Sequence, residues 1–146
     1  MENICPKVGS GVVIIRDGKT LLAKRKGAHA EGTWGSLGGH VESGESPMEA
    51  SIREAREELG IEIGNLTFAS CTSMIKYDRH YIDISFTAEI ISGEPTICEP
   101  DKIEEIGWFD LEALPEPLFE PVRRVFDALK TGTVYCEVRE GGTSNG

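Results

Sequence analysis

Residues 39–61 read GHVESGESPMEASIREAREELGI, and this stretch decides how the chain folds. Ser46 can cap a helix, and Pro47 suits the first helical position. Glu49 stands three residues after Ser46, which is the spacing of a capping box. Gly60 favours a helix end. The segment therefore predicts a loop followed by a helix over residues 47–59.

The two faces of this helix differ sharply. At about 100° per residue, the apolar side chains form one stripe that we expect to be buried: Met48, Ile52, Ala55 and Leu59. Three carboxylates occupy an arc of about 100° on nearly the opposite side: Glu54, Glu57 and Glu58. Like charges at these spacings destabilise a helix by tenths of a kcal/mol per pair. Taken alone, the pattern also fits an ordinary solvated acidic face.

The residues before the helix favour a metal site instead. Gly38 and Gly39 lead into the segment. Adjacent glycines allow close backbone approach, so a main-chain carbonyl can join a metal and the amides can face a phosphate. Mg²⁺ prefers hard oxygen ligands together with substrate phosphates. Clustered carboxylates beside paired glycines therefore predict a site where a divalent cation bridges the protein to a phosphorylated ligand.

This segment resembles the Nudix box, G-x5-E-x7-R-E-U-x-E-E-x-G-U with U apolar, at every fixed position from Gly39 to Ile61. The resemblance covers roughly residues 8 to 130. Short matches at Gly38-Gly39-His40, His80-Tyr81 and Glu99-Pro100-Asp101-Lys102 are most similar to the MutT-like branch. The resemblance to the family implies an α+β fold, a Nudix-type α/β/α sandwich with a mixed central sheet. Family members often have Leu-Pro before the glycines, where this chain has Ser36-Leu37.

The resemblance also implies residue roles. The metal ligands would be Glu54, Glu57, Glu58 and the Gly39 carbonyl. Arg53 and Glu45 would pair and orient the helix and loop for catalysis. Glu54 or Glu57 would receive the proton of the attacking water, with Glu104 or Glu105 as further candidates for a ligand or base. The substrate would contact Gly38, His40 and Glu104. From their place on the second strand, Lys24 and Arg25 would either hold the phosphates or be ordinary solvated residues of an edge strand. Mg²⁺ would be the cofactor, and Mn²⁺ would substitute.

Outward from the box, runs of residues that favour strands, at 11–16 and 20–26, flank Asp17-Gly18, a strong hairpin signal. Residues 32–44 are too rich in glycine to predict a regular element. Strands are expected at 61–63, 66–75, 80–91 and 103–109, with a turn near Tyr77-Asp78-Arg79. Helical spacing follows at 118–129. We expect one domain over residues 1–140 and a flexible tail at 141–146.

Composition narrows the function classes. The 146 residues have a formal net charge of −10, which disfavours nucleic acid polymers and anionic lipid as partners. The apolar runs are too short to span a bilayer, and no secretory signal is visible. Four scattered cysteines without a CxxC pair are typical of reduced thiols in a cytoplasmic protein.

Three functions remain open at this point. The first is hydrolysis of a (deoxy)nucleoside triphosphate to the monophosphate and pyrophosphate. The second is cleavage of ADP-ribose, a nucleotide sugar or another nucleoside diphosphate derivative. The third is a nucleotide-binding module without turnover, which the complete set of box acids disfavours. We expect a monomer or a homodimer.

Overall fold

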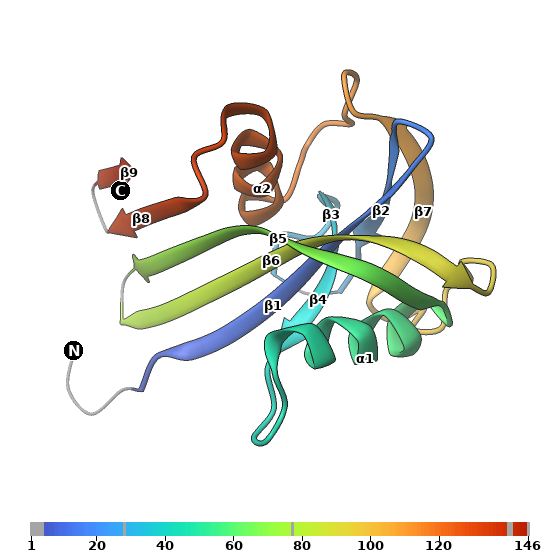
Figure 1. The fold of residues 1–146 in the computed structure, drawn as a ribbon, viewed down its shortest axis with the longest axis horizontal. Helices are drawn as coiled ribbons and strands as arrows, with labels where there is room; N and C mark the ends of the chain where they lie inside the picture. Colours follow the sequence, from blue (N-terminus) through green and yellow to red (C-terminus); the bar gives the residue numbers. More distant parts are fainter. Residues whose placement is uncertain (1–4, 28, 77, 140–141, 146) are drawn as a thin grey trace.

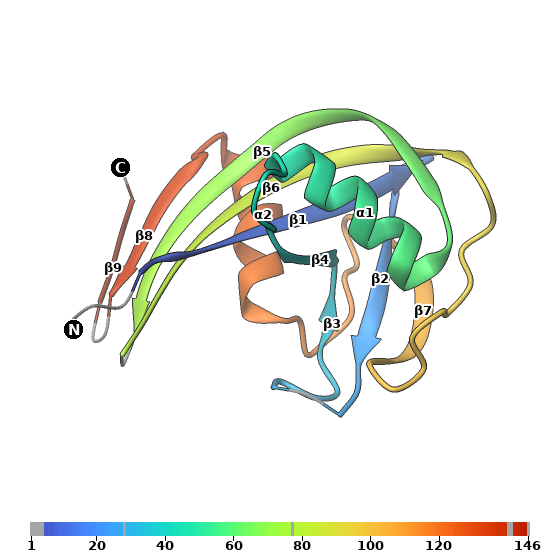
Figure 2. The same cartoon turned by 90° about the horizontal axis from the view of Figure 1, so that it is seen from below.

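A mixed β-sheet lies between two helices in the computed structural model (Figures 1 and 2). The structure describes residues 5–27, 29–76, 78–139 and 142–145. Its elements are β1 (Lys7–Arg16), β2 (Lys19–Arg25), β3 (Trp34–Gly35), β4 (Leu37–His40), α1 (Pro47–Leu59), β5 (Glu62–Lys76), β6 (Arg79–Ser92), β7 (Ile103–Asp110), α2 (Glu120–Thr131), β8 (Tyr135–Arg139) and β9 (Gly142–Asn145). The predicted α+β class with a mixed sheet is confirmed.

Strand β1 organises the sheet, whose path runs β3-β2-β1-β6-β5-β8-β9. Its second half pairs antiparallel with β2, and its first half pairs antiparallel with β4. Along its other edge β1 pairs in parallel with β6, whereas β5 and β6 form a long antiparallel pair. Strand β7 extends the far side of β2. The chain segments on both sides of the Nudix-like box therefore meet at β1.

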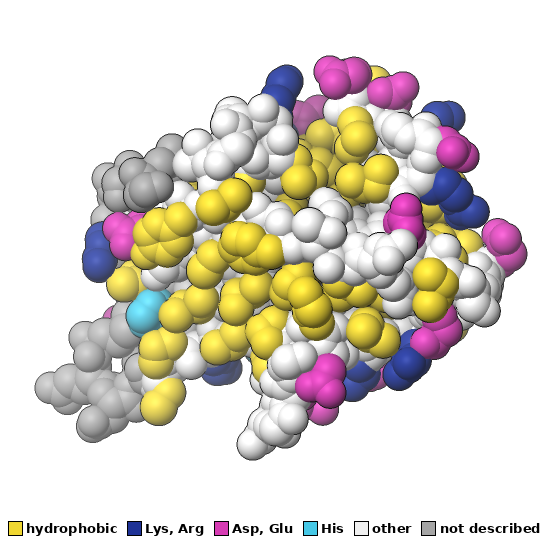
Figure 3. Space-filling model, in the orientation of Figure 1, with side chains coloured by type: hydrophobic (Ala, Val, Ile, Leu, Met, Phe, Trp, Pro, Cys, Tyr) yellow, Lys and Arg dark blue, Asp and Glu magenta, His cyan; other side chains and the backbone are white. Residues whose placement is uncertain are grey.

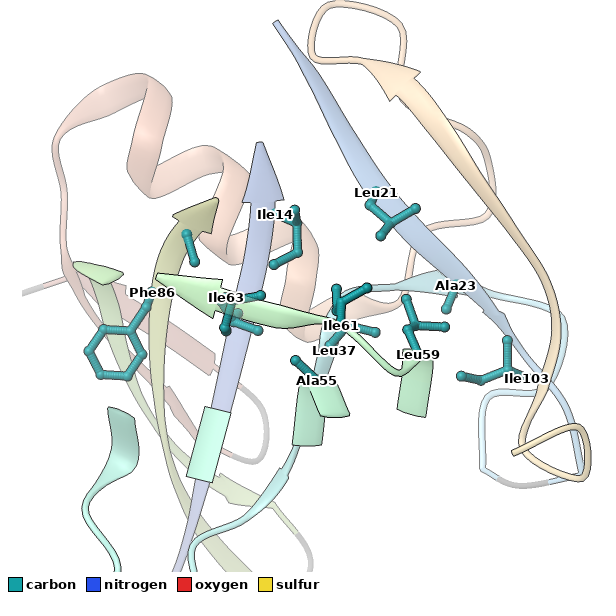
Figure 4. Packing of buried hydrophobic residues seen from close by; sticks show 12 residues of the cluster. Ile14, Leu21, Ala23, Leu37, Ala55, Leu59, Ile61, Ile63, Phe86 and Ile103 are labelled. Atoms are coloured by element: carbon teal, nitrogen blue, oxygen red, sulfur yellow. The ribbon is translucent and has the colours of Figure 1, made fainter. Parts of the chain in front are cut away.

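The two faces of the sheet are covered by different helices. Val12 and Ile14 of β1 are buried in a cluster with Ala55 and Leu59 of α1, whereas Val13 belongs to a cluster with α2 residues. Alternate residues of a strand point to opposite faces, so α1 and α2 pack on opposite sides. Figure 4 shows the α1-side cluster, in which Leu37 and Leu59 lie close to Ile61. This cluster anchors α1 against β4.

Several predicted elements need correction. The hairpin at Asp17-Gly18 is confirmed, with φ of 52° and 75°. The expectation that residues 32–44 form no regular element is wrong, because β3 and β4 lie within them. Glycines pair there as well as any residue does, since a neighbouring strand supplies the hydrogen bonds. Strand β8 was not predicted from the sequence. Tyr77, in the predicted turn, lies outside the described residues.

The C-terminal region differs in detail from the sequence-based expectation. Helix α2 begins two residues later than predicted and ends at Thr131. Residues Gly142–Asn145, expected to belong to a flexible tail, pair with β8 as β9, while Gly141 and Gly146 lie outside the described residues. All four cysteines are free thiols. Among the described residues, no helix is both long and apolar enough to cross a membrane.

Candidate active site

Helix α1 begins and ends as its sequence dictates. The Ser46 hydroxyl accepts a hydrogen bond from the Glu49 amide at 3.1 Å, and the Glu49 carboxylate accepts one from the Ser46 amide at 2.8 Å. This reciprocal pair is the predicted capping box. Gly60 ends the helix in the left-handed region, with φ of 67°. The acidic residues are thus held on a helix with fixed ends.

The buried face of α1 matches the predicted apolar stripe in part, because Ala55 and Leu59 are buried and Ile52 packs against their cluster, whereas Met48 does not. Met48 is 42% exposed, whereas Ala50 and Ser51 are fully buried with Ala55 and Leu59. The Ser51 hydroxyl is hydrogen-bonded to that of Ser10 on β1. Small side chains on this face let α1 approach β1 and β4 closely. The contact turns the helix so that some of its carboxylates face the sheet, where the sequence analysis placed all of them on the opposite side.

Glu54 is one of the carboxylates turned toward the sheet. Its side chain is only 17% exposed and lies over Gly39 of β4. A Cβ at residue 39 would overlap the Glu54 carboxylate, so only glycine leaves room for it. Burial raises the pKa of Glu54, although the Arg53 guanidinium opposes the shift. Gly39 therefore forms one wall of a small acidic cradle.

Glu58 lies one turn further along α1 and is more deeply buried. Its carboxylate accepts a hydrogen bond from the Gly38 amide at 2.9 Å. Burial is the main cause that raises the pKa of Glu58, to about 8, and neighbouring Glu54 adds to the rise. Because the Gly38 amide is used in this way, it is not free to face a phosphate as the sequence suggested. Two acids in contact favour sharing one proton.

Arg53 joins the predicted loop residue to the helix acids. Its guanidinium binds both oxygens of Glu45, at 2.8 and 3.0 Å, and donates to the His40 carbonyl at 3.1 Å. The same group donates to Glu54 at 2.9 Å and to Glu57 at 3.2 Å. The Arg53 hydrogen bonds lower the pKa of Glu45 to about 2. The predicted pair of Arg53 with Glu45 is therefore present.

The positions of the acidic side chains show how well a divalent cation would fit between them. Within the described residues, no three histidine, cysteine or acidic side chains stand close enough together to hold an ion. Glu54 and Glu58 share a buried position, whereas Glu57 is 46% exposed and pairs with Arg53. The buried pair offers hard oxygen ligands, and the space above Gly39 that a Cβ would fill holds the Glu54 carboxylate. Two of the three predicted carboxylate ligands, Glu54 and Glu58, thus lie together, and their role as metal ligands stays a prediction.

The predicted basic residues lie on β2. Lys24 forms an ion pair with Glu104 at 3.3 Å. Arg25 lies over the Phe119 ring, 4.1 Å from its centroid, and its Nε donates to the His29 carbonyl at 3.0 Å. Burial lowers the pKa of Arg25, and the negative charge of Glu58 opposes that shift. Arg25 is the predicted cation that faces the acidic pair.

The two candidate acids outside the box, Glu104 and Glu105, lie on β7, and their role as a ligand or base stays a prediction. Glu104 is held by Lys24, and Glu105 stands opposite Lys24 in the β2–β7 register. Glu99 is instead near enough to Glu58 for its charge to raise the Glu58 pKa further. The loop before β7 brings it there, because the Cys98 amide bonds the Glu58 carbonyl at 3.0 Å. Sequence spacing gives no signal for this loop contact.

Several known proteins are similar to this chain. The family model described as the NUDIX domain matches residues 6–129. The chain is 34% identical over 120 residues to a protein of Pseudomonas aeruginosa named NAD-capped RNA hydrolase NudC, covering 76% of this chain and 42% of that protein. It is 38% identical over 104 residues to the NudC of Chromobacterium violaceum, covering 71% and 38%. The chain thus spans less than half the length of these curated relatives.

Solved structures show the same fold. A structure titled MutT NUDIX hydrolase from Burkholderia pseudomallei is 40% identical, with a TM-score of 0.80, and the match covers 85% of this chain and 98% of that one. A UDP-X diphosphatase structure matches with a TM-score of 0.70 at 19% identity, over 92% of this chain and 68% of that one. The second likeness concerns the fold alone.

Proposed function

Because the chain belongs to the NUDIX family and is a Nudix hydrolase, we propose that it uses Mg²⁺ to hydrolyse a (deoxy)nucleoside triphosphate to the monophosphate and pyrophosphate. The observation behind this proposal is the buried pair of Glu54 and Glu58 against Gly38 and Gly39. An anionic substrate meets an acidic protein there, so a cation must lie between them.

The residues of the site would have different roles in hydrolysis. Glu54 and Glu58 would hold the cation, with the Gly39 carbonyl beside them. A bound Mg²⁺ supplies positive charge to phosphate oxygens and acidifies water. Arg53 fixes Glu54 through its bonds to Glu45 and the His40 carbonyl. Arg25, opposite Glu58, would bind a phosphate oxygen.

One carboxylate of α1 takes the proton from the attacking water, and Glu54 and Glu57 are the two candidates. The water oxygen forms a bond to phosphorus while the bridging oxygen leaves with the bond's electron pair. The proton on the carboxylate then passes to solvent. Glu99, close to Glu58, is a further acid at the site that the sequence analysis did not single out.

A second candidate function follows from the named relatives. The two proteins named NAD-capped RNA hydrolase NudC are 34% and 38% identical to this chain. Their names favour a diphosphate that joins two nucleosides over a triphosphate. The product distinguishes the two: a triphosphate gives inorganic pyrophosphate, and a dinucleotide gives two monophosphates. Although the net charge disfavours polymer binding, capped RNA belongs in the substrate panel.

Replacing Glu58 by Gln tests the proposal. We expect turnover to fall by several orders of magnitude with the fold intact, because the buried pair loses one ligand charge. Chelation with EDTA should abolish activity of the unmodified protein, and Mg²⁺ or Mn²⁺ should restore it. The measurement is release of monophosphate and pyrophosphate, with circular dichroism as the check on folding.

Glu62→Gln is the matched control, since Glu62 is an exposed acid paired with Arg56 and should leave turnover unchanged. Near-normal activity of Glu58→Gln, or activity that survives thorough chelation, would contradict the metal assignment. Carrying out the reaction in heavy-oxygen water adds the position of attack, because the labelled product contains the attacked phosphorus.

A further inference from the structure

The sheet face that α1 covers extends beyond the helix and leaves an apolar surface open. Ser10 of β1 faces α1, because its hydroxyl donates to the Pro47 carbonyl at 2.6 Å. Alternate residues of a strand share a face, so Val8 points to the same side, whereas Gly9 and the Asp83 that lies over it point to the other. Following the register from β1 through β6 and β5 to β8 gives the residues that we call the open patch: Val8, Phe68, Cys71, Ile82, Ile84 and Tyr135.

The open patch is exposed although its side chains are apolar. Phe68, Tyr135 and Val8 are 49%, 37% and 36% exposed, and Figure 3 shows apolar side chains gathered over β1, β5 and β6. On α1, the exposed Met48 stands one turn before Ile52, which packs against the α1-side cluster as Ile84 does, so Met48 lies at the margin of the patch. Contiguous exposed apolar surface of this kind marks an interaction site.

The size of the open patch suits a weak contact between two proteins. The strands β1, β6, β5 and β8 together measure about 19 Å across, and the distance from the row of Ile75 and His80 to the row of Phe68 and Phe86 is about 20 Å. The footprint is therefore about 400 Å², and two copies in contact would bury about 800 Å² before Met48 and the corrugation of the side chains are counted. Specific interfaces begin at about 1,000 Å², so the patch is large enough for reversible association and too small for a permanent complex.

The charges around the open patch favour a second copy of the chain as the partner. The whole chain has a formal net charge of −10, whereas the residues of the patch are uncharged, so two copies can approach there without placing like charges in contact. On the same face of β8, beyond Tyr135, Glu137 and Arg139 stand in register with Ser73 and Ile75. A strongly acidic or strongly basic partner would be repelled by one of these two charges. A second copy related by a two-fold axis presents both signs in return.

We propose that the open patch is the contact surface of a weak homodimer, in which two copies pack sheet against sheet about a two-fold axis. Sheets in face-to-face contact lie about 10 Å apart, with their strands crossing at about 30°. The acidic cradle stays open in this dimer, because Glu54 lies over Gly39 of β4, and β4 and β6 pair with opposite edges of β1. The inference goes beyond the proposed function and does not depend on it.

Sedimentation velocity over a range of protein concentrations tests the inference. The unmodified protein should pass from monomer to dimer between about 1 and 100 μM, because a small interface gives weak association. Phe68→Ser should raise the dissociation constant about 10-fold or more, since an aromatic residue near the middle of an interface carries much of the binding energy and each dimer loses two copies of it. Val8→Ser, on another strand of the same patch, should also weaken the dimer, and circular dichroism checks that both variants are folded.

Ile91→Ser is the matched control. Ile91 is 66% exposed, but it lies outside the open patch and points to the other face, because its neighbour Ile90 packs against the α1-side cluster. This variant should dimerise as the unmodified protein does.

Cys71 provides a second measurement, because it is a free thiol within the open patch, whereas the exposed Cys98 lies on the loop before β7. Alkylation by iodoacetamide, followed for each cysteine by mass spectrometry, should slow at Cys71 as the protein concentration rises through the transition, and should stay constant at Cys98. In Phe68→Ser, the rate at Cys71 should no longer depend on concentration over this range.

A protein that stays monomeric at 100 μM, or a dimer weakened equally by Phe68→Ser and Ile91→Ser, would overturn the inference. So would association that continues to large species, since a two-fold contact closes at the dimer. Co-sedimentation of a monomeric protein with phosphatidylcholine vesicles, lost in Phe68→Ser, would assign the patch to a lipid surface and likewise overturn it. Hydrolysis is not measured in these experiments, so their failure would leave the proposed function untouched.

Discussion

At the scale of single residues, Arg53 connects more of the site than any acid does. Its planar guanidinium binds Glu45 with two bonds, reaches Glu54 and Glu57, and holds the His40 carbonyl. A guanidinium has five donors in a fixed fork, whereas a lysine ammonium is a compact point charge. The position of Glu54 over Gly39 therefore depends on an arginine and not simply on a positive charge.

Arg53→Lys should accordingly lower kcat by about 10- to 100-fold, the range for groups that orient metal ligands. The kcat values of the variant and the unmodified protein would be measured by steady-state hydrolysis at saturating Mg²⁺. Arg56→Lys is the matched control on the same helix, because Arg56 is 58% exposed and pairs only with Glu62 among the described residues. Comparable losses in both variants would show that the effect comes from the helix and not from the Arg53 network.

At the scale of elements, the approach of α1 to β4 creates the acidic site. Ser51 and the alanines on the buried face allow the close contact, and Gly39 leaves room for Glu54 on the strand side. Two carboxylates, Glu54 and Glu58, are buried as a result, and burial raises the pKa of each. The helix is therefore packed in a way that favours a proton on the pair unless a cation replaces it.

This arrangement predicts how stability varies with pH in the chelated protein. The folded-state pKa of Glu58 is raised from its ordinary 4.5 to about 8, so between these values the folded protein holds a proton that the unfolded chain has released. Its stability should therefore fall as the pH rises from about 4.5 to about 8. Melting temperatures measured in EDTA across this pH range test the predicted fall in stability.

Glu58→Gln should flatten that trend, and saturating Mg²⁺ should oppose it by binding the deprotonated pair. Glu45 does not interfere, because its pKa is lowered to about 2 and its contribution is lost only on acidification below its ordinary value. A melting temperature independent of pH in the unmodified protein would contradict the burial of the acidic pair.

At the scale of the whole molecule, one sheet joins two separate apolar clusters. The α1-side cluster includes Val12, and the α2-side cluster includes Val13. Adjacent residues of β1 thus belong to both, so losing the strand removes both clusters. Figure 3 also shows apolar side chains spread over the face seen in Figure 1. The large apolar residues exposed on the described part of the molecule include Phe68 and Tyr135.

The shared strand predicts a single unfolding transition. Trp34 lies in the α2-side cluster and Trp108 packs against the α1-side cluster. The variants Trp34→Phe and Trp108→Phe each leave one tryptophan to report on one face. In each variant, the unfolding midpoint measured by fluorescence should coincide with the midpoint measured by circular dichroism, as two-state unfolding requires. Fluorescence transitions that separate from the circular dichroism would indicate two independently folding units.

Local signals in the sequence were sufficient for much of the fold. The capping box, Gly60 and the Asp17-Gly18 turn act within a few residues, so the helix and the first hairpin could be predicted. Strands β4 and β8 could not, because β4 exists through its pairing with β1 and β8 through its pairing with β5. The direction of the acids was also missed. Helical spacing finds the apolar stripe, but the small residues at the sheet contact decided which face is buried.

By itself, the sequence determined the box and the helix that bears its acids, since these depend on residue type and short spacing, and the pairing of Arg53 with Glu45 was implied by the resemblance to the family. Only the tertiary structure decided that Glu54 and Glu58 face β4 while Glu57 stays outside, that Glu99 lies near Glu58, and that Asp83 lies over Gly9. The physical reason is that each of these depends on the distance between strands or loops far apart in the chain, which spacing along the sequence does not encode.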